Sequence, residues 1–267
     1  MSKTRYELLG CIHHESPNEL VQTFVNDYRG MANYPKEWSA SGIREDEVFT
    51  SLSLAVLQHL GFSTPAWLPE RINEGFNAAL DYFFGTWHRH LDPRDYGPNE
   101  KWFQTFSRGL FLGLLTERWE DVAKLCSFAR SDLPAEYLGD EIEWEGTLVY
   151  LSIAADLRPE PLDGLEDVEA KINKCKRKRP RLLFKAWEAA RARDQAAFNK
   201  AIKESLKHFD GSYFAPRLHS MIDWIAEHQT VIVLAAMRLG LKFPDLPERL
   251  AAMIVTRESL GLEPKAS

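Results

Sequence analysis

The sequence has few cysteines, no long apolar run and no excess of basic residues, and each shortage excludes a class of protein. The three cysteines, Cys11, Cys126 and Cys175, are odd in number and widely spaced. Neither a disulfide framework nor a zinc knuckle is therefore indicated, and a reducing cytoplasm is the expected location. The longest apolar run, Val231 to Met237, is far shorter than a membrane span, and the first ten residues hold no apolar core of signal-peptide length. We expect no membrane partner.

The charge balance argues against a nucleic-acid partner. The 267 residues carry 33 Lys and Arg against 39 Asp and Glu, a formal net charge of −6. A general nucleic-acid binder usually presents a net basic surface. The rest of the composition, with 45% hydrophobic and 27% charged residues, is that of a globular protein with a sizeable core, so bulk disorder is excluded.

Sequence motifs for catalysis and cofactor binding are also missing. The chain contains no phosphate loop, dinucleotide fingerprint, nucleophile elbow or zincin motif. His88 and His90 lie two positions apart, and on a helix their side chains would point about 200° away from each other, which does not suit a metal pair. The run His13-His14-Glu15 has no ligand-spaced partner and is predicted to be a loop. We therefore expect no metal, no cofactor and no catalytic residue, although catalytic triads can assemble in space without a sequence motif.

Apolar residues recur at helical spacing along most of the chain, which predicts an all-α fold. A capping box, Ser16-Pro17-Asn18-Glu19, precedes a stripe that ends at Tyr28. A second stripe runs from Phe49 to Leu60 before Gly61, a natural helix stop. The clearest stripe covers Phe76 to Trp87, and Gly97-Pro98-Asn99 then breaks the chain.

The C-terminal third is predicted to be helical despite some β-branched runs. Residues 147–151 and 231–234 favour strands by composition, but each lies inside a longer helical pattern without hairpin turns. One long helix is predicted from Leu218 to Gly240. Pro244 and Pro247 then bracket a turn before a short last helix.

Two helical hairpins are predicted in the middle of the chain. Their helices are Trp102–Leu114 with Trp119–Ala129, and Leu183–Ala190 with Phe198–Phe209. Trp119 and Phe198 each open a second helix and could wedge between the paired helices. A true solenoid is expected to have at least three regular copies. We therefore favour one domain over residues 1–267, an irregular multi-helix bundle of antiparallel hairpins. Its N-terminal region, residues 1–97, is less clearly defined, whereas residues 98–260 are rich in hairpins, and repeat-like packing is the alternative.

Charged residues are segregated into two neighbouring blocks. Pro134–Ala170 holds eleven acidic residues and one basic, whereas Lys171–Lys185 holds eight basic residues and none acidic. Charge runs of this kind are usually solvated surfaces. In the basic run Lys174–Arg181 no aromatic residue is interleaved to stack on bases, and the acidic neighbour would largely cancel the steering of a nucleic acid.

Five segments of the chain share a common character: Trp102–Phe111, Glu117–Cys126, Phe184–Trp187, Asp194–Ala201 and Ala235–Leu241. Together they resemble the central portion of the immunity protein 49 family of bacterial polymorphic-toxin systems. They are helical aromatic and alanine patterns, and they span about residues 100 to 250. The basic run Lys174–Arg181 lies outside this pattern.

The resemblance implies an all-helical, non-enzymatic protein that binds and neutralises a cognate toxin domain. It carries over no catalytic residue, cofactor or metal. Stoichiometric occlusion of a toxin requires an interface of standard size and, for fast association, complementary charge. The acidic residues Asp140, Glu141, Glu143 and Glu145 are the predicted partner-binding surface; the competing interpretation is a plain solvated helix start.

Two other functions stay open at this point. A helical-repeat adaptor would bind an endogenous protein or peptide in a concave groove lined by stacked hairpins. A small-molecule enzyme would use a pocket between helices near His88, His90 or His228, where histidine and carboxylate side chains converge.

Overall fold

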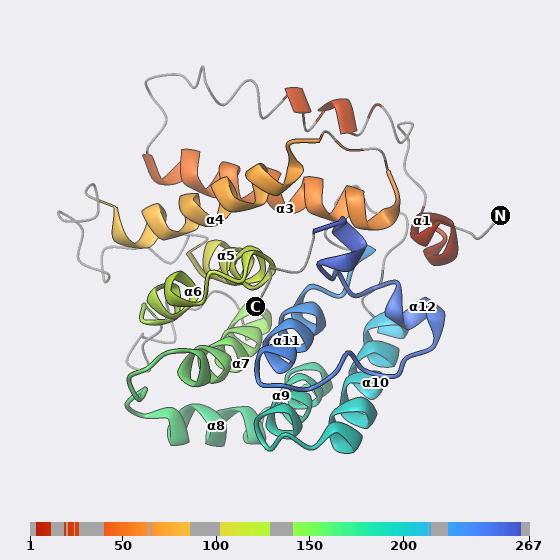
Figure 1. The fold of residues 1–267 in the computed structure, drawn as a ribbon. Coiled ribbons are helices and arrows are strands. Elements are labelled where there is room, and N and C mark those ends of the chain that lie inside the picture. The colour runs from red at the N-terminus through yellow and green to blue at the C-terminus, as the bar shows by residue number, and fades with distance from the viewer. Residues whose placement is uncertain are drawn as a thin grey trace.

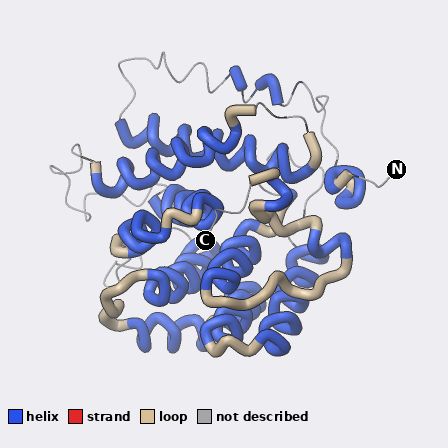
Figure 2. Tube along the Cα trace, viewed as in Figure 1, coloured by secondary structure: helices blue, strands red, loops and turns tan. Residues whose placement is uncertain are grey.

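The computed structural model describes residues 4–11, 40–62, 66–85, 102–128, 141–212 and 224–262, with positions 19, 21–23, 25–26, 64 and 214. Within these ranges the side chains of residues 40–41, 102–103 and 141–147 are not described. No described residue lies in a β-strand, and helices joined by loops make up the molecule (Figure 2). The prediction of an all-α fold is confirmed.

The helices follow one another as in Figure 1. They are α1 (Arg5–Leu9), α3 (Ala40–Leu60), α4 (Leu68–Phe84), α5 (Trp102–Thr116), α6 (Trp119–Cys126), α7 (Glu141–Leu157), α8 (Leu165–Lys174), α9 (Lys178–Arg191), α10 (Gln195–Ser212), α11 (Glu227–Arg238), α12 (Glu248–Ala251) and the 3₁₀ helix η5 (Glu258–Leu260).

Four successive helix pairs build the domain: α3 with α4, α5 with α6, α7 with α8, and α9 with α10. The two predicted hairpins are thus present, and two further pairs give the bundle a repeat-like order. The turns of the predicted hairpins also match, because Glu117 and Arg193 both adopt φ 56° two residues before the next helix begins.

Helix α11 fills the space among the pairs. It packs against α5, α7, α9 and α10 and lies between them in Figure 1. Residues Gln229 to Ala236 are all buried, so every side of this helix faces protein. This explains why the composition of residues 231–234 favours a strand. A helix that is buried on all sides has a continuous apolar sequence instead of an apolar stripe along one face.

The predicted start of that C-terminal helix is wrong. Ile225 lies before α11, and Ala226 interrupts the helix with φ −87° and ψ 76°. The cause is tertiary: the Ala226 N–H donates to the carbonyl oxygen of Met253 at 2.9 Å, which holds this backbone against the C-terminal segment. Leu218 and Ile222 lie outside the described residues. The predicted stop is confirmed, since Gly240 has φ +97°.

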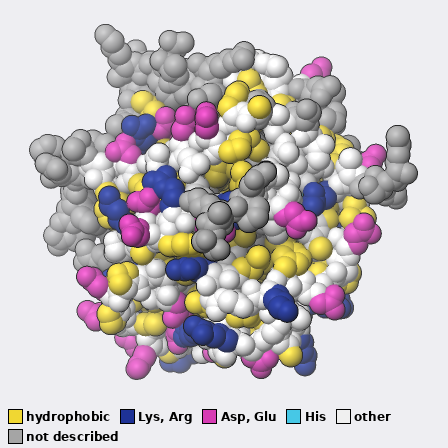
Figure 3. All heavy atoms as spheres, in the orientation of Figure 1, with side chains coloured by type: hydrophobic (Ala, Val, Ile, Leu, Met, Phe, Trp, Pro, Cys, Tyr) yellow, Lys and Arg dark blue, Asp and Glu magenta, His cyan; other side chains and the backbone are white. Residues whose placement is uncertain are grey.

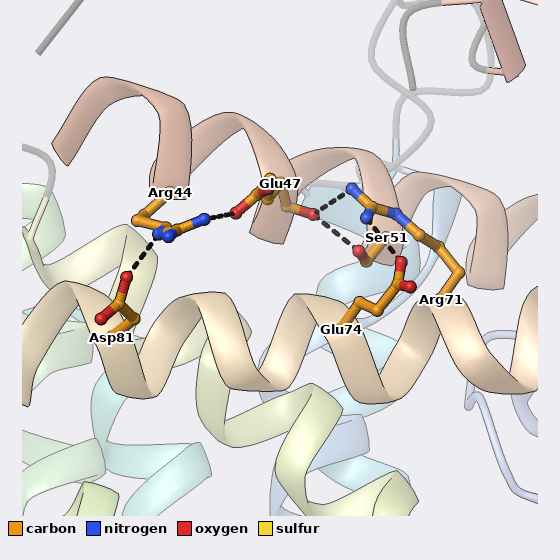
Figure 4. A network of polar contacts seen from close by, with 6 residues as sticks. All are labelled: Arg44, Glu47, Ser51, Arg71, Glu74 and Asp81. Atoms are coloured by element: carbon orange, nitrogen blue, oxygen red, sulfur yellow. Dashed lines mark hydrogen bonds and ion pairs between the residues drawn. The ribbon is translucent and has the colours of Figure 1, made fainter. Parts of the chain in front are cut away.

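Helix α3 lies along α4 at short range, and polar side chains link the two (Figure 4). The Arg44 guanidinium bridges Glu47 at 2.7 Å and Asp81 at 2.6 Å. Arg71 is only 3% exposed and donates to the Glu47 carbonyl oxygen at 3.3 Å, and the Ser51 hydroxyl donates to the same oxygen at 2.6 Å. These bonds hold α3 and α4 together along one side of their contact.

Small residues allow the helices to approach this closely. A Cβ added at Gly75 would lie 2.3 Å from Ser51 Oγ, and one at Gly109 would lie 2.6 Å from the Ala79 Cβ. These two contacts therefore leave no room for a residue larger than glycine.

The aromatic residues that open the second helix of each predicted hairpin differ in burial. Phe198 is fully buried, whereas Trp119 is half-buried and stacks under the Arg238 guanidinium, 4.6 Å from the ring centroid.

Some sequence predictions fall on residues that the structure does not describe. These are the capping residues Ser16-Pro17-Asn18, the loop His13-His14-Glu15, the pair His88 and His90, and the break Gly97-Pro98-Asn99. The helix predicted after the capping box is described only in some positions, and Glu19, Val21 and Val25 are helical there.

Candidate functional site

The predicted acidic surface lies at the start of α7. Glu141, Glu143 and Glu145 belong to the first turns of this helix, but their side chains are outside the described residues, and Asp140 lies before them. Their role as a partner-binding surface stays a prediction. The helix itself is confirmed, including the strand-like run 147–151, of which Leu148 to Leu151 are buried.

Most of the described remainder of the acidic block lies at the surface. Glu160, Asp163, Glu166 and Asp167 are exposed on α8 and on the connection before it. Acidic side chains line the lower left rim of the molecule over these elements in Figure 3. Asp156 and Glu169 instead turn toward a single arginine.

That arginine, Arg191 of α9, joins three helices. Its guanidinium lies 2.8 Å from the Asp156 carboxylate on α7 and 2.7 Å from the Glu169 carboxylate on α8. It also donates to Ser152 Oγ at 2.5 Å, while the Trp187 indole N–H donates to Asp156 at 3.0 Å. Burial raises the pKa of the Asp156 carboxyl, and the Arg191 charge opposes this rise. Because the network joins side chains of three helices, it links the packing of α7, α8 and α9.

The basic run covers the end of α8 and the start of α9. Lys174, Lys176, Lys178 and Arg181 are exposed there. Arg181 donates to the carbonyl oxygen of Arg177 at 3.3 Å, and among the described residues the three lysines have no ion-pair partner. Helix α9 has no acidic residue in its first turn and no side-chain cap. These cations therefore lie at the helix end that carries positive partial charge, where cations are unfavourable.

A second polar cluster surrounds the first turn of α11 inside the bundle. His228 Nδ1 lies 3.1 Å from the hydroxyl of Tyr150 on α7, and the two rings meet edge to face with centroids 5.4 Å apart. Tyr150 is 1% exposed. Glu227 accepts a hydrogen bond from Ser107 Oγ of α5 at 3.3 Å.

Burial keeps both members of the Tyr150–His228 pair neutral. It raises the pKa of the Tyr150 hydroxyl well above 10, and the nearby Glu227 charge adds to the rise, whereas Arg179 and Arg108 oppose it. Burial lowers the pKa of His228 well below 6.5, and the Arg179 charge lowers it further. The neutral phenol and the neutral imidazole share one hydrogen bond. A phenol that stays protonated is not an activated nucleophile.

The same turn of α11 has a clear structural role. Four consecutive polar side chains point to four different elements: Glu227 to Ser107 of α5, His228 to Tyr150 of α7, Gln229 to Ser205 of α10 at 3.1 Å, and Thr230 to the Val255 N–H of the C-terminal segment at 3.3 Å. A buried polar group that loses its partner is destabilising. These bonds therefore define both the rotation and the axial position of a helix whose apolar surface alone would specify neither.

Another buried histidine joins the two ends of the chain. His59 of α3 is 0% exposed, with Nε2 2.8 Å from the Ala252 carbonyl oxygen and Nδ1 2.7 Å from Ser259 Oγ. Burial lowers its pKa to about 4, the hydrogen bond to Ala252 opposes the shift, and the Arg5 charge adds to it. The sequence did not mark this residue, because a single histidine at a helix end carries no motif.

The cysteines are free thiols. Burial raises the pKa of Cys11 and of Cys126 to about 12, so both stay protonated at neutral pH, while Cys175 is half-buried in the basic run. Within the described ranges, no three His, Cys, Asp or Glu side chains gather in a way that could hold a metal ion. Nor does any described helix have the length and apolarity to cross a membrane. No family model, curated protein or solved structure matches the chain.

Proposed function

We propose that this chain is a non-enzymatic immunity protein that binds a cognate bacterial toxin domain and neutralises it by stoichiometric occlusion. The observation that carries the proposal is the distribution of polar groups in the described residues. Tyr150 and His228 are bonded to each other inside the bundle, and Asp156 at the surface is bonded to Trp187 and Arg191 of α9. Exposed charges of both signs lie on α8 and at the start of α9, where another macromolecule can meet them.

The segments that resemble the immunity protein 49 family support the proposal by their placement. They fall on α5 with α6, on α9 with α10, and on the end of α11. Helix α11 packs against α5, α9 and α10. The resembling segments therefore lie on helices that pack against one another, as expected if the segments belong to one fold.

The proposed binding surface is the start of α7 with Asp140, Glu141, Glu143 and Glu145. An acidic surface accelerates association with a basic partner, and this acceleration disappears as salt screens it. The first experiment is calorimetry of the purified chain against the C-terminal domain of a toxin encoded by a neighbouring gene, combined with rescue of cells that express this domain. We expect one-to-one binding and rescue; no binding to such a domain would contradict the proposal.

Charge reversal tests the surface separately from the function. In the variant E141K/E143K/E145K we expect the association rate with the toxin domain to fall by about 10-fold or more at low salt, with little change in the dissociation rate. The control is D245K/E248K, which reverses two exposed acids on another surface, near α12. An unchanged association rate in the α7 variant would remove this surface from the proposal and leave toxin binding itself standing.

A small-molecule enzyme is the second candidate, because one observation favours it. Tyr150, His228 and Glu227 converge from α7 and α11, and Arg108 and Arg179 lie close enough to influence the tyrosine pKa. The neutral, mutually bonded state of the pair speaks for a structural role. A repeat adaptor has less support, since α11 occupies the space inside the helix pairs where a peptide would bind.

A further inference from the structure

Helix α8 presents a complete face to solvent. It packs against α7 and α9 through Val168 and Ile172, and it lies at the lower edge of the molecule in Figure 1. The opposite face is exposed and consists of Glu166, Asp167, Ala170, Lys171, Asn173 and Lys174. A ten-residue helix is about 15 Å long, so this face is a short, straight edge.

Charge changes sign along this edge. Glu166 and Asp167 lie in the first turn of α8, and Lys171 and Lys174 lie in the last turn. The polarity continues into the flanking connections. The exposed Glu160 and Asp163 precede the helix, and the exposed Lys176, Lys178 and Arg181 follow it.

Helix dipoles explain only some of this pattern. Acidic residues at the start and basic residues at the end of α8 suit its own macrodipole. The same principle makes Lys178 and Arg181 unfavourable at the start of α9, where no acidic residue or side-chain cap offsets them. Among the described residues, Lys174, Lys176 and Lys178 have no ion pair. The basic half of the edge therefore has unmatched positive charge that an external anionic surface would stabilise.

The edge is complementary to itself. Around a two-fold axis at Ala170, a small residue that permits close approach, position 166 faces position 174. Glu166 would thus meet Lys174 of the partner subunit. A long polyanion such as nucleic acid would instead run from the basic half onto the acidic half and be repelled there. We propose that α8 is the contact of a two-fold symmetric, salt-sensitive dimer of this chain, in which α8 helices from two copies pair antiparallel.

The size of the edge limits the strength of this dimer. Residues 160–181 form one short strip on each copy, whereas a standard interface buries about 800 Å² per partner and involves roughly 20–30 residues a side. The dimer is therefore weak, and its stability depends on ion pairs that salt screens over a Debye length of about 10 Å at 0.1 M. This proposal is independent of toxin binding.

Sedimentation equilibrium of the full chain tests it, at about 50 mM and about 500 mM salt. Two variants each make the exposed face of α8 uniform in sign: E166K/D167K leaves this face entirely basic and K171E/K174E leaves it entirely acidic. Each should dimerise at least ~10-fold more weakly than the natural chain at low salt, because like charges then face each other. Mixing the two should restore association as a heterodimer. D245K/E248K is the control of equal charge change, and circular dichroism checks that α8 still folds.

The outcomes separate the possibilities. A dimer at low salt that weakens at high salt and in both single-sign variants, and returns in the mixture, supports the proposal. A monomer at every salt concentration overturns it, as does a dimer that the variants leave unchanged. Binding of a fluorescent single-stranded oligonucleotide by a monomeric chain, lost in K171E/K174E, would assign the basic half to a polyanion and also overturn it.

Discussion

Acidification of the buried His59 should destabilise the protein, and the structure indicates by how much. The imidazole is fully buried on α3 between the Ala252 carbonyl oxygen and the Ser259 hydroxyl. Its Nε2 must carry the proton in order to donate to the Ala252 carbonyl oxygen, so the neutral ring accepts from Ser259 at Nδ1. A second proton would place a charge where water cannot solvate it, and for this reason the pKa falls from 6.5 to about 4.

The sign and magnitude follow from proton linkage. Between pH 6.5 and about pH 4 the unfolded chain binds a proton at His59 and the folded chain does not, so acid favours unfolding. The stabilising contribution is complete above pH 6.5 and is lost progressively as the pH falls toward 4. A shift of this size corresponds to about 3 kcal/mol in total, of which about 2 kcal/mol is lost by about pH 5.

Urea denaturation at several pH values between about 7.5 and 4.5 measures this loss. The matched variant is His59→Gln, whose amide can still donate to the Ala252 carbonyl oxygen and does not titrate. We expect the variant to be less stable at neutral pH but to lose about 2 kcal/mol less than the natural chain on going to about pH 5. The half-buried His228 contributes to both curves and cancels in the difference. Parallel curves for the two proteins would refute the assignment of this proton to His59.

Three further predictions concern packing and buried polar groups, and a fourth concerns the attachment of α1. Gly75→Ala places a Cβ 2.3 Å from Ser51 Oγ, so the free energy of unfolding should fall by about 1–3 kcal/mol in urea melts. Gly211→Ala, in a helix and with nothing within 4 Å, should raise it by about 0.5–1 kcal/mol, and a loss there would contradict the reasoning. Tyr150→Phe takes the hydroxyl away from a buried imidazole and should cost about 1–2 kcal/mol of stability while leaving toxin binding unchanged; a loss of binding with stability intact would show a functional role. Arg249→Met removes the guanidinium that bonds α10 and the last carbonyl oxygens of α1, so limited proteolysis should release the N-terminal segment before the rest is cut.

Local sequence signals were sufficient for most helices and for their ends. Phe49 to Leu60 and Leu183 to Ala190 repeat at the period of a helix that faces the core on one side, and both stretches are helical. Gly61 and Gly240 end their helices at positive φ, where glycine has no steric penalty. Helix α1 was missed although its signal is local. Thr4 and Glu7 form a capping box and Gly10 ends the helix, but five residues are too short for periodicity to reveal.

Long-range contacts decided what periodicity could not. The start of α11 is set by a hydrogen bond from Ala226 to Met253, which lies 27 positions further along the chain. His228 was named from the sequence as a possible site residue, but its partner Tyr150 lies 78 positions away and determines that the imidazole is hydrogen-bonded. No local pattern reports such a partner, because hydrogen bonds between helices depend on how the helices are stacked.

The sequence alone therefore determined the all-α class, the two central hairpins and the segregation of charge, because each depends on residues within a few turns of one another. Tertiary structure alone decided that α11 packs among α5, α7, α9 and α10, that its polar first turn fastens it to four elements, and that acidic and basic residues share one edge on α8. Burial from all sides and complementarity across a surface arise only when distant segments meet.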